Sequence, residues 1–303
     1  MLVKRLSNKE KQYNSNDLCD LYAFYNNFKT VDELINFIKA YPLDNNIKIK
    51  ETGPDSDIAV VVPTSNSKRE ITLDCIKLYK DFKVILVESG PPYFRFAHSV
   101  NEGIKVALKN RPKWVVISND DIYEIDKIAS LRSALLSLDP KKICVVYTNP
   151  ESIQSHNITI ARERKPLRII RKIRGGYYHA YQDISDKFSA RLDIIHNLDL
   201  KSRLKAIFLY KNLLSFRGIG SFMILSGEYL KRQKGELLDI NFLNGYEDVD
   251  LSYRLYKENV SCAYINFRIG VYSGFTLGAG RRRLLRDMTG RIYFNYKWRR
   301  LCR

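Results

Sequence analysis

The chain has 303 residues, of which 45% are hydrophobic, so it is long enough to bury a sizeable core. Its formal charge of +18 at pH 7 predicts an anionic partner, such as nucleic acid, an acidic membrane surface or a phosphorylated substrate. The five cysteines form no C-x-x-C pair, which argues against a zinc site or a disulfide framework. No apolar run is long enough to span a bilayer, so we expect a cytoplasmic protein, with or without peripheral attachment to a membrane.

Residues 1–52 are predicted to form an N-terminal helical extension. Thr30 and Glu33 have the spacing of a helix-capping box, and apolar residues follow them at helical spacing. The segment from Gly53 to Asp55 then interrupts the helical pattern. We therefore expect a separate domain to begin at residue 53.

Three buried strands are predicted next, at residues 58–62, 82–87 and 114–117. Each is a nearly continuous apolar run, as expected of a parallel strand that helices cover on both faces. Helical segments separate the runs, which indicates repeated crossover connections. The predicted fold class is α/β, with a mostly parallel, Rossmann-like central sheet flanked by helices.

Polar residues follow all three strands and are expected to converge on one crevice, because ligands of open α/β sheets bind beyond the carboxyl ends of the strands. These residues are Thr64, Asn66, Glu88, Asp120 and Asp121. No G-x-G-x-x-G or Walker A motif follows the first strand, which argues against dinucleotide and P-loop sites. A nucleotidyltransferase would also need a glycine-rich loop there, and the segment from Pro63 to Asn66 contains no glycine.

Two segments are strongly basic. Residues 151–217 are predicted to be a basic helical insertion, and residues 276–303 a basic, aromatic C-terminal segment. Within 162–174 and 281–303, isoleucines or aromatic residues lie between the cations. A basic run is usually a solvated face, but interleaved apolar residues predict contact with an anionic membrane surface.

The stretch from Asn244 to Leu255 joins a turn dipeptide, Asn244-Gly245, to an acidic helix start. Asp248 lies in the expected first turn, where free N–H groups and the helix dipole favour an ionised carboxylate that could act as a general base. Asp250 and Arg254 are predicted to brace the helix as an i, i+4 ion pair. Acidic residues are also common at helix starts simply because they complement the dipole, so this stretch alone does not separate the two roles.

Six separated motifs, taken in chain order, resemble the family 2 nucleotide-sugar glycosyltransferases, which have the GT-A fold. The motifs are Val61-Val-Pro-Thr-Ser-Asn66, Leu86-Val-Glu-Ser-Gly90, the segment from Arg95 through Asn101 to Gly103, Ser118-Asn-Asp-Asp121, Gly218-Ile-Gly-Ser-Phe-Met223 and Tyr246-Glu-Asp-Val-Asp250. Each motif alone is weak evidence for this family, but the six motifs in this order are strong evidence. The resemblance implies a GT-A-like domain over residues 53–275, with the basic insertion inside it.

The resemblance also implies a hexosyltransferase-like enzyme. It would move a sugar from a nucleotide-diphosphate sugar to a hydroxyl of a glycan, lipid-linked or protein acceptor, with inversion of configuration. Asp121 would bind Mn²⁺ or Mg²⁺ through the diphosphate, and Asp248, with Glu247 beside it, would be the catalytic base. The residues implied to bind the nucleotide sugar are Pro63, Thr64, Asn66, Glu88, Arg95, Asn101 and Asp120.

The chain departs from the family pattern at three places. Asn119 stands where the D-x-D motif usually begins with aspartate, and Glu88 replaces a shorter aspartate. Tyr272-Ser273-Gly274 stands where a metal-binding histidine is expected. The four histidines are interpreted as ordinary surface or packing residues. The departures leave open a catalytically inactive nucleotide-sugar-binding relative. A basic nucleic-acid-binding protein is the other alternative. It would not explain the acidic residues at 120, 121, 247 and 248, which a phosphate-binding groove would normally avoid.

Overall fold

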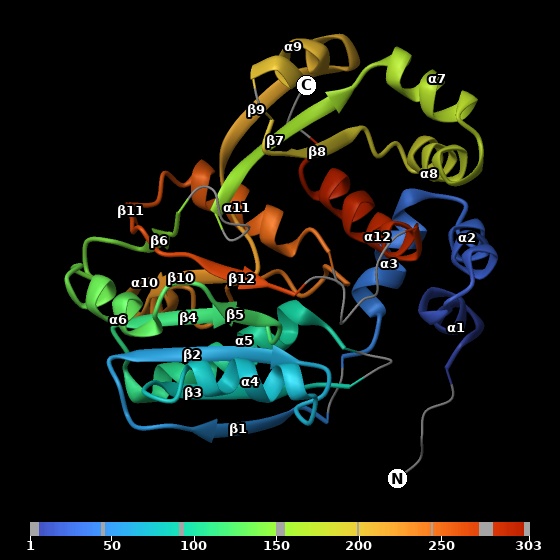
Figure 1. Cartoon of the computed structure of the whole chain (residues 1–303). Coiled ribbons are helices and arrows are strands. Elements are labelled where there is room, and N and C mark those ends of the chain that lie inside the picture. The colour runs from blue at the N-terminus through green and yellow to red at the C-terminus, as the bar shows by residue number, and fades with distance from the viewer. Residues whose placement is uncertain are drawn as a thin grey trace.

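The computed structural model describes residues 6–43, 46–90, 94–149, 155–198, 200–243, 245–272 and 281–299. Its centre is a seven-stranded sheet with the strand order β1-β3-β2-β4-β10-β6-β11 (Figure 1). These strands are β1 (Lys48–Thr52), β2 (Ile58–Thr64), β3 (Lys83–Glu88), β4 (Trp114–Ser118), β6 (Val145–Tyr147), β10 (Phe222–Ser226) and β11 (Cys262–Tyr264). The predicted α/β class is confirmed. The sheet is mixed and only partly parallel, because β1 and β10 run antiparallel to their neighbours.

Helices cover both faces of this sheet. Ala59 and Val61 of β2 pack with α5 (Phe96–Ala107), α10 (Gly227–Arg232) and α11 (Glu247–Lys257). Val60 and Val62 pack on the other face, with α4 (Glu70–Leu78) and α6 (Ile128–Leu136). A two-stranded sheet of β5 (Ile122–Glu124) and β12 (Ile269–Val271) continues this second core. Because successive side chains of β2 enter opposite cores, its sequence has to be apolar throughout.

Residues 155–219 form a second unit, which is not purely helical as predicted. It contains α7 (Lys165–Ile173), α8 (Gly176–Lys187) and α9 (Leu200–Leu209), together with a three-stranded antiparallel sheet. In that sheet β7 (Ser155–Glu163) lies between β8 (Leu192–His196) and β9 (Tyr210–Ile219). Ile158 and Ile160, two residues apart on β7, are buried in one core. This two-residue period is the strand signal within a segment that is otherwise conspicuous for its charge.

The N-terminal helices pack against the last helix of the described chain. These are α1 (Asn8–Asn14), α2 (Leu18–Asn26) and α3 (Val31–Ala40), which share a largely aromatic core with α12 (Arg281–Lys297). The Tyr25 hydroxyl donates a hydrogen bond to the Leu285 carbonyl (2.5 Å). Thr30 caps α3 by accepting a hydrogen bond from the Glu33 amide (3.2 Å), as predicted. The N-terminal helical region is therefore confirmed for residues 8–40, and it packs against α12. Residues 48–52, which were predicted to belong to it, instead form β1 at the edge of the central sheet, so this sheet begins before residue 53.

The packing of α12 corrects the prediction that its aromatic residues contact a membrane. Tyr293 and Phe294 are buried in the core, and the indole N–H of Trp298 donates to Asp250 (2.8 Å). The buried rings of Tyr293 and Phe294 therefore cannot contact a bilayer. The side chains of residues 281–284, and all of residues 300–303, lie outside the described part of the chain. Within the described ranges, no helix combines the length and apolar character needed to cross a membrane.

Candidate active site

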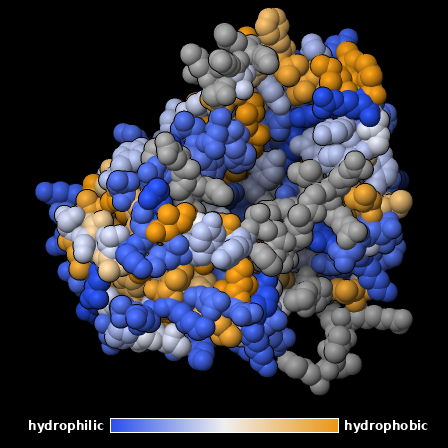
Figure 2. Space-filling view, in the orientation of Figure 1, coloured by the Kyte–Doolittle hydropathy of each residue, from blue (hydrophilic) through white to orange (hydrophobic). Residues whose placement is uncertain are grey.

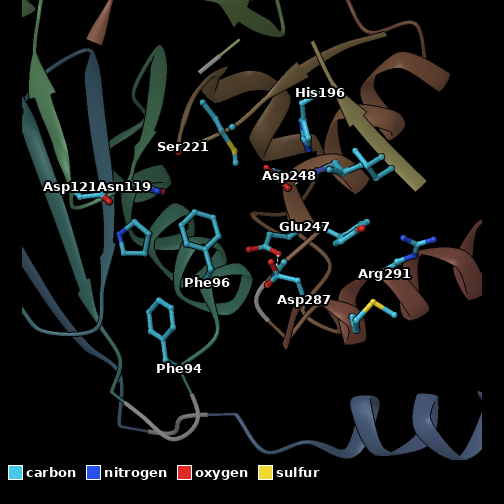
Figure 3. Close-up of a pocket in the computed structure, with 18 of the residues that line it drawn as sticks. Phe94, Phe96, Asn119, Asp121, His196, Ser221, Glu247, Asp248, Asp287 and Arg291 are labelled. Carbon is cyan, nitrogen blue, oxygen red and sulfur yellow. Dashed lines mark hydrogen bonds between the residues drawn. The ribbon is translucent and has the colours of Figure 1, made fainter. Parts of the chain in front are cut away.

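A cavity of about 490 Å³ lies between the carboxyl ends of the central strands, the start of α11 and one side of α12 (Figure 3). Asn119 and Asp121 lie on one side of it, and Asp248, Glu247 and Asp287 lie on the other (Figure 3). The second unit contributes the remaining wall. The lining includes Pro63, Phe94, Phe96, Asn119, Asp120, Asp121, Tyr181, Asp193, His196, Ser221, Glu247, Asp248, Asp287, Met288 and Arg291.

The loop after β4 holds two adjacent carboxylates in different surroundings. Asp120 accepts hydrogen bonds from the hydroxyls of Thr64 (2.5 Å) and Thr72 (3.2 Å) and forms an ion pair with Arg69. Asp121 is also buried, but no described residue donates a hydrogen bond to its Oδ1. Burial, with a smaller contribution from Asp120, raises the pKa of Asp121 to about 6. An unsatisfied carboxylate oxygen beside a cavity is a suitable ligand for a cation.

The end of β2 contacts Asp120, and the end of β3 lies beside the end of β2. Thr64 donates to Asp120 and also accepts a hydrogen bond from the Asn66 amide (3.1 Å). Glu88 accepts a hydrogen bond from the Ser67 amide (2.9 Å), and hydrogen bonding by Ser67 lowers the pKa of Glu88. Pro63 and Asp120 line the cavity itself, whereas Thr64, Asn66 and Glu88 lie next to that lining. Whether they bind a nucleotide stays a prediction.

Arg95 and Asn101, two further residues predicted to bind the nucleotide sugar, lie away from this cavity. Arg95 is buried and donates hydrogen bonds to the carbonyls of Ile240 (2.8 Å) and Tyr41. Burial lowers the pKa of Arg95 to about 10. The Asn101 side chain exchanges hydrogen bonds with the backbone of Leu238 (2.8 and 3.0 Å). Both side chains bind the backbone of other segments, so the structure does not bring them to the cavity.

The start of α11 presents Glu247 and Asp248 to the cavity. Tyr246, the residue before the helix, has φ = 72°, a left-handed conformation that costs a non-glycine residue about 1–2 kcal/mol. Glu247 accepts a hydrogen bond from the Gly245 amide (2.6 Å), and Asp248 accepts one from the Val249 amide (2.8 Å). Helix α12 passes close behind this turn. A β-carbon at Gly290 would lie 2.3 Å from the Gly245 carbonyl oxygen, so only glycine allows this approach.

Asp250 faces the protein interior, although it is only two residues from Asp248. Its predicted ion pair with Arg254 is confirmed, with Arg254 Nε at 3.0 Å. The Asp250 side chain is completely buried and also binds Lys297 Nζ (2.9 Å) and the Trp298 indole (2.8 Å). Asp250 therefore joins α11 to the end of α12 and does not line the cavity.

The surroundings of Glu247 disfavour its ionised form. Burial of Glu247, followed by repulsion from Asp248, raises the pKa of Glu247 to about 8. Asp287 adds a smaller repulsion from α12. At neutral pH Glu247 therefore holds a proton for most of the time and is not available to accept one. Carboxyls whose pKa is shifted by burial and a charged neighbour are common at functional sites.

Glu247→Gln is expected to alter the pH dependence of stability. Folding raises the pKa of Glu247 from 4.5 to about 8, so its stability contribution is complete below pH 4.5 and is lost as the pH rises through 8. Glutamine retains the acceptor for Gly245 but does not ionise. The free energy of unfolding of the variant, relative to wild type, should rise between pH 5 and 9 by at most about 4 kcal/mol. Thermal unfolding across this range measures the effect, and a constant difference would contradict it.

His196 and Arg291 line the cavity but were not predicted. His196, at the end of β8, is exposed, and one of its ring nitrogens lies 2.8 Å from a ring nitrogen of His156. Arg291 is fully buried on α12 and pairs with Glu163 (2.6 Å) and Asp193 (3.0 Å). No motif in the sequence indicated that α12 would line the cavity.

Comparisons with known proteins add little to this description. No family model matches the chain, and no curated protein matches it. Among solved structures, the chain is similar to A197 from STIV, with a TM-score of 0.37 and 12% sequence identity. The aligned region covers 71% of this chain and 85% of that one. The functional proposal therefore depends on the side chains of the cavity.

Proposed function

We propose that this protein is a glycosyltransferase, which moves a sugar from a nucleotide-diphosphate sugar to an acceptor hydroxyl. The observation that carries the proposal is the meeting, in one cavity, of Asp121 after β4 with Glu247 and Asp248 at the start of α11. Sugar transfer needs one group that handles a diphosphate and another that accepts a proton. The two sides of this cavity offer these two chemistries to a single bound donor.

The donor side fits a divalent cation. Among the described residues, no group of three His, Cys, Asp or Glu side chains could hold a metal by itself. Mg²⁺ and similar ions usually bind one or two protein carboxylates and take their other ligands from water and substrate phosphates. Asp121, with its unsatisfied Oδ1, fits the role of the protein ligand. The bound ion would neutralise negative charge that develops on the leaving diphosphate.

The acceptor side places Asp248 as the general base. Asp248 would remove the proton of the acceptor hydroxyl as its oxygen attacks the anomeric carbon, and the bond to the diphosphate would break on the opposite face. One direct displacement of this kind inverts the configuration. Glu247, neutral near pH 7, would lie beside the base without competing for the proton. A glycan, a lipid-linked sugar or a protein side chain could supply the hydroxyl.

A panel of nucleotide-diphosphate sugars tests this function. With Mn²⁺ present, at least one donor should raise the Tm and release its nucleoside diphosphate slowly in the absence of an acceptor. Phe94 lines the cavity (Figure 3), so Phe94→Ala should weaken the binding of the donor that stabilises the wild type. If no donor in the panel stabilises the protein or is hydrolysed, the proposed function is wrong.

Asp121→Ala is expected to weaken binding of that donor by roughly tenfold or more, because it removes the carboxylate that would hold the cation. EDTA should weaken binding to wild type by a similar factor and should have little further effect on the variant. Titration calorimetry with and without EDTA measures both effects. Asp74→Asn, at an exposed carboxylate on α4, is the control. Donor binding that neither EDTA nor Asp121→Ala changes would refute the metal assignment.

A further inference from the structure

An exposed apolar surface lies on α7 and α9, at the top of the molecule in Figure 2. We call it the α7–α9 patch. Its most exposed members are Ile173 and Phe208, with exposed fractions of 79% and 77%. The full set is Ile169, Ile170, Ile173, Ile207 and Phe208. Grouped exposed side chains of this kind indicate a binding surface, because isolated hydrophobic residues are common on proteins but clusters are not.

A surface helix usually turns its apolar side chains to the core and its charged side chains to solvent. In α7, two arginines point toward the protein and three isoleucines point toward solvent. Arg171 pairs with both Glu163 (its closest partner) and Asp193 (2.7 Å), and Arg168 pairs with Asp186 (2.8 Å). These ion pairs fix the rotation of the helix about its axis. Its isoleucines are therefore held toward solvent and cannot turn into the core without breaking partly buried ion pairs.

A basic groove lies beside the α7–α9 patch. The groove is lined by Arg162, Arg164, Lys165 and Lys211, together with Phe208 of the patch. Glu163, the acidic residue in this lining, is already paired with two arginines, Arg171 and Arg291. Among the described residues, no acidic side chain forms an ion pair with Lys165 or Lys211. The groove is therefore positively charged next to a surface that is apolar.

We propose that the α7–α9 patch and this basic groove dock the protein on a bilayer that contains anionic lipids. Aliphatic side chains such as Ile173 would enter the boundary between headgroups and acyl chains, while Lys165 and Lys211 would bind lipid phosphates. A nucleic acid offers the same phosphates but no apolar layer for the isoleucines. The combination of the two surfaces therefore favours a membrane. Among the residues whose side chains the structure describes, the docking surface lies on the second unit.

Co-sedimentation with liposomes tests the proposal independently of transfer activity. The full chain should bind vesicles of phosphatidylcholine with phosphatidylglycerol more tightly than pure phosphatidylcholine vesicles, and added salt should weaken the binding. Lys165→Gln and Lys211→Gln should each weaken it roughly fivefold. Ile173→Ser and Phe208→Ser should each weaken it about tenfold, and these losses should persist at high salt.

Two matched controls lie elsewhere on the surface. Leu73→Ser removes an apolar side chain that is 45% exposed on α4, and Lys141→Gln removes an exposed cation. Both should bind vesicles like the wild type, and unchanged Tm values of all variants would exclude unfolding as the cause of a loss. Failure to bind anionic vesicles, or equal losses in the controls, would overturn the proposal. Tighter binding to DNA or RNA than to vesicles at the same salt concentration would overturn it as well.

Discussion

Replacing Asp248 with asparagine is expected to lower the transfer rate by roughly 10²- to 10⁴-fold while leaving donor affinity nearly unchanged. The amide has the size of the carboxylate, and its oxygen can still accept the hydrogen bond from the Val249 amide. It cannot take a proton from the acceptor hydroxyl. Titration calorimetry with the donor and a transfer assay on the same preparation separate the two effects, because only the rate should fall.

Glu258→Gln is the matched control for this change. Glu258 is an exposed carboxylate at the opposite end of α11, so its substitution should leave the transfer rate at the wild-type level. Asp250→Asn would be a poor control, because the Asp250 side chain is buried between Arg254, Lys297 and Trp298 and its loss should destabilise the protein. An Asp248→Asn variant that transfers sugar at the wild-type rate would show that Asp248 only complements the helix dipole.

Arg291→Met is expected to destabilise the protein by roughly 3–5 kcal/mol. Arg291 is completely buried and pairs with Glu163 and Asp193 from two different strands. Methionine occupies much of the same volume, but it leaves the two carboxylates with Arg171 as their remaining arginine. Urea unfolding followed by circular dichroism measures the loss.

A second substitution distinguishes lost charge pairing from lost packing. Arg291→Met leaves two carboxylates with one arginine, so adding Glu163→Gln removes the excess negative charge and should restore part of the stability. Arg299→Met, at an exposed arginine just beyond α12, should change stability by no more than about 0.5 kcal/mol. If Arg291→Met unfolds at the wild-type urea concentration, or if the double variant is less stable than the single one, the ion-pair network does not stabilise the fold as inferred.

The elements of the candidate site that could be predicted are those that a short stretch of sequence specifies. Strand β4 was recognisable as a short apolar run, and Asp120 and Asp121 follow it directly. The helix that carries Asp248 was recognisable from its acidic start and helical spacing. The meeting of these pieces followed from a general property of α/β sheets, in which the carboxyl ends of parallel strands lie at one edge.

Long-range contacts could not be predicted in the same way. The sequence shows that Arg95 and Arg291 are cations, but their burial depends on which distant segments pack around them. Arg95 binds the carbonyls of Tyr41 and Ile240, and neither contact has a spacing that a pattern would reveal. The strands of the second unit were missed for a related reason, since β7 pairs with β9 across about 50 residues of intervening basic sequence.

The hydrogen bond between Tyr25 and Leu285 joins positions that are 260 residues apart. Helix α12, which receives this bond, brings Asp287, Met288 and Arg291 to the cavity. A contact over such a distance forms only after the chain has closed a very long loop, and the entropy lost in closing it is not recovered until the helices on both sides are present. The part of the cavity wall that α12 forms should therefore be among the last parts of the molecule to fold. A chain with a complete central sheet can still lack a working site.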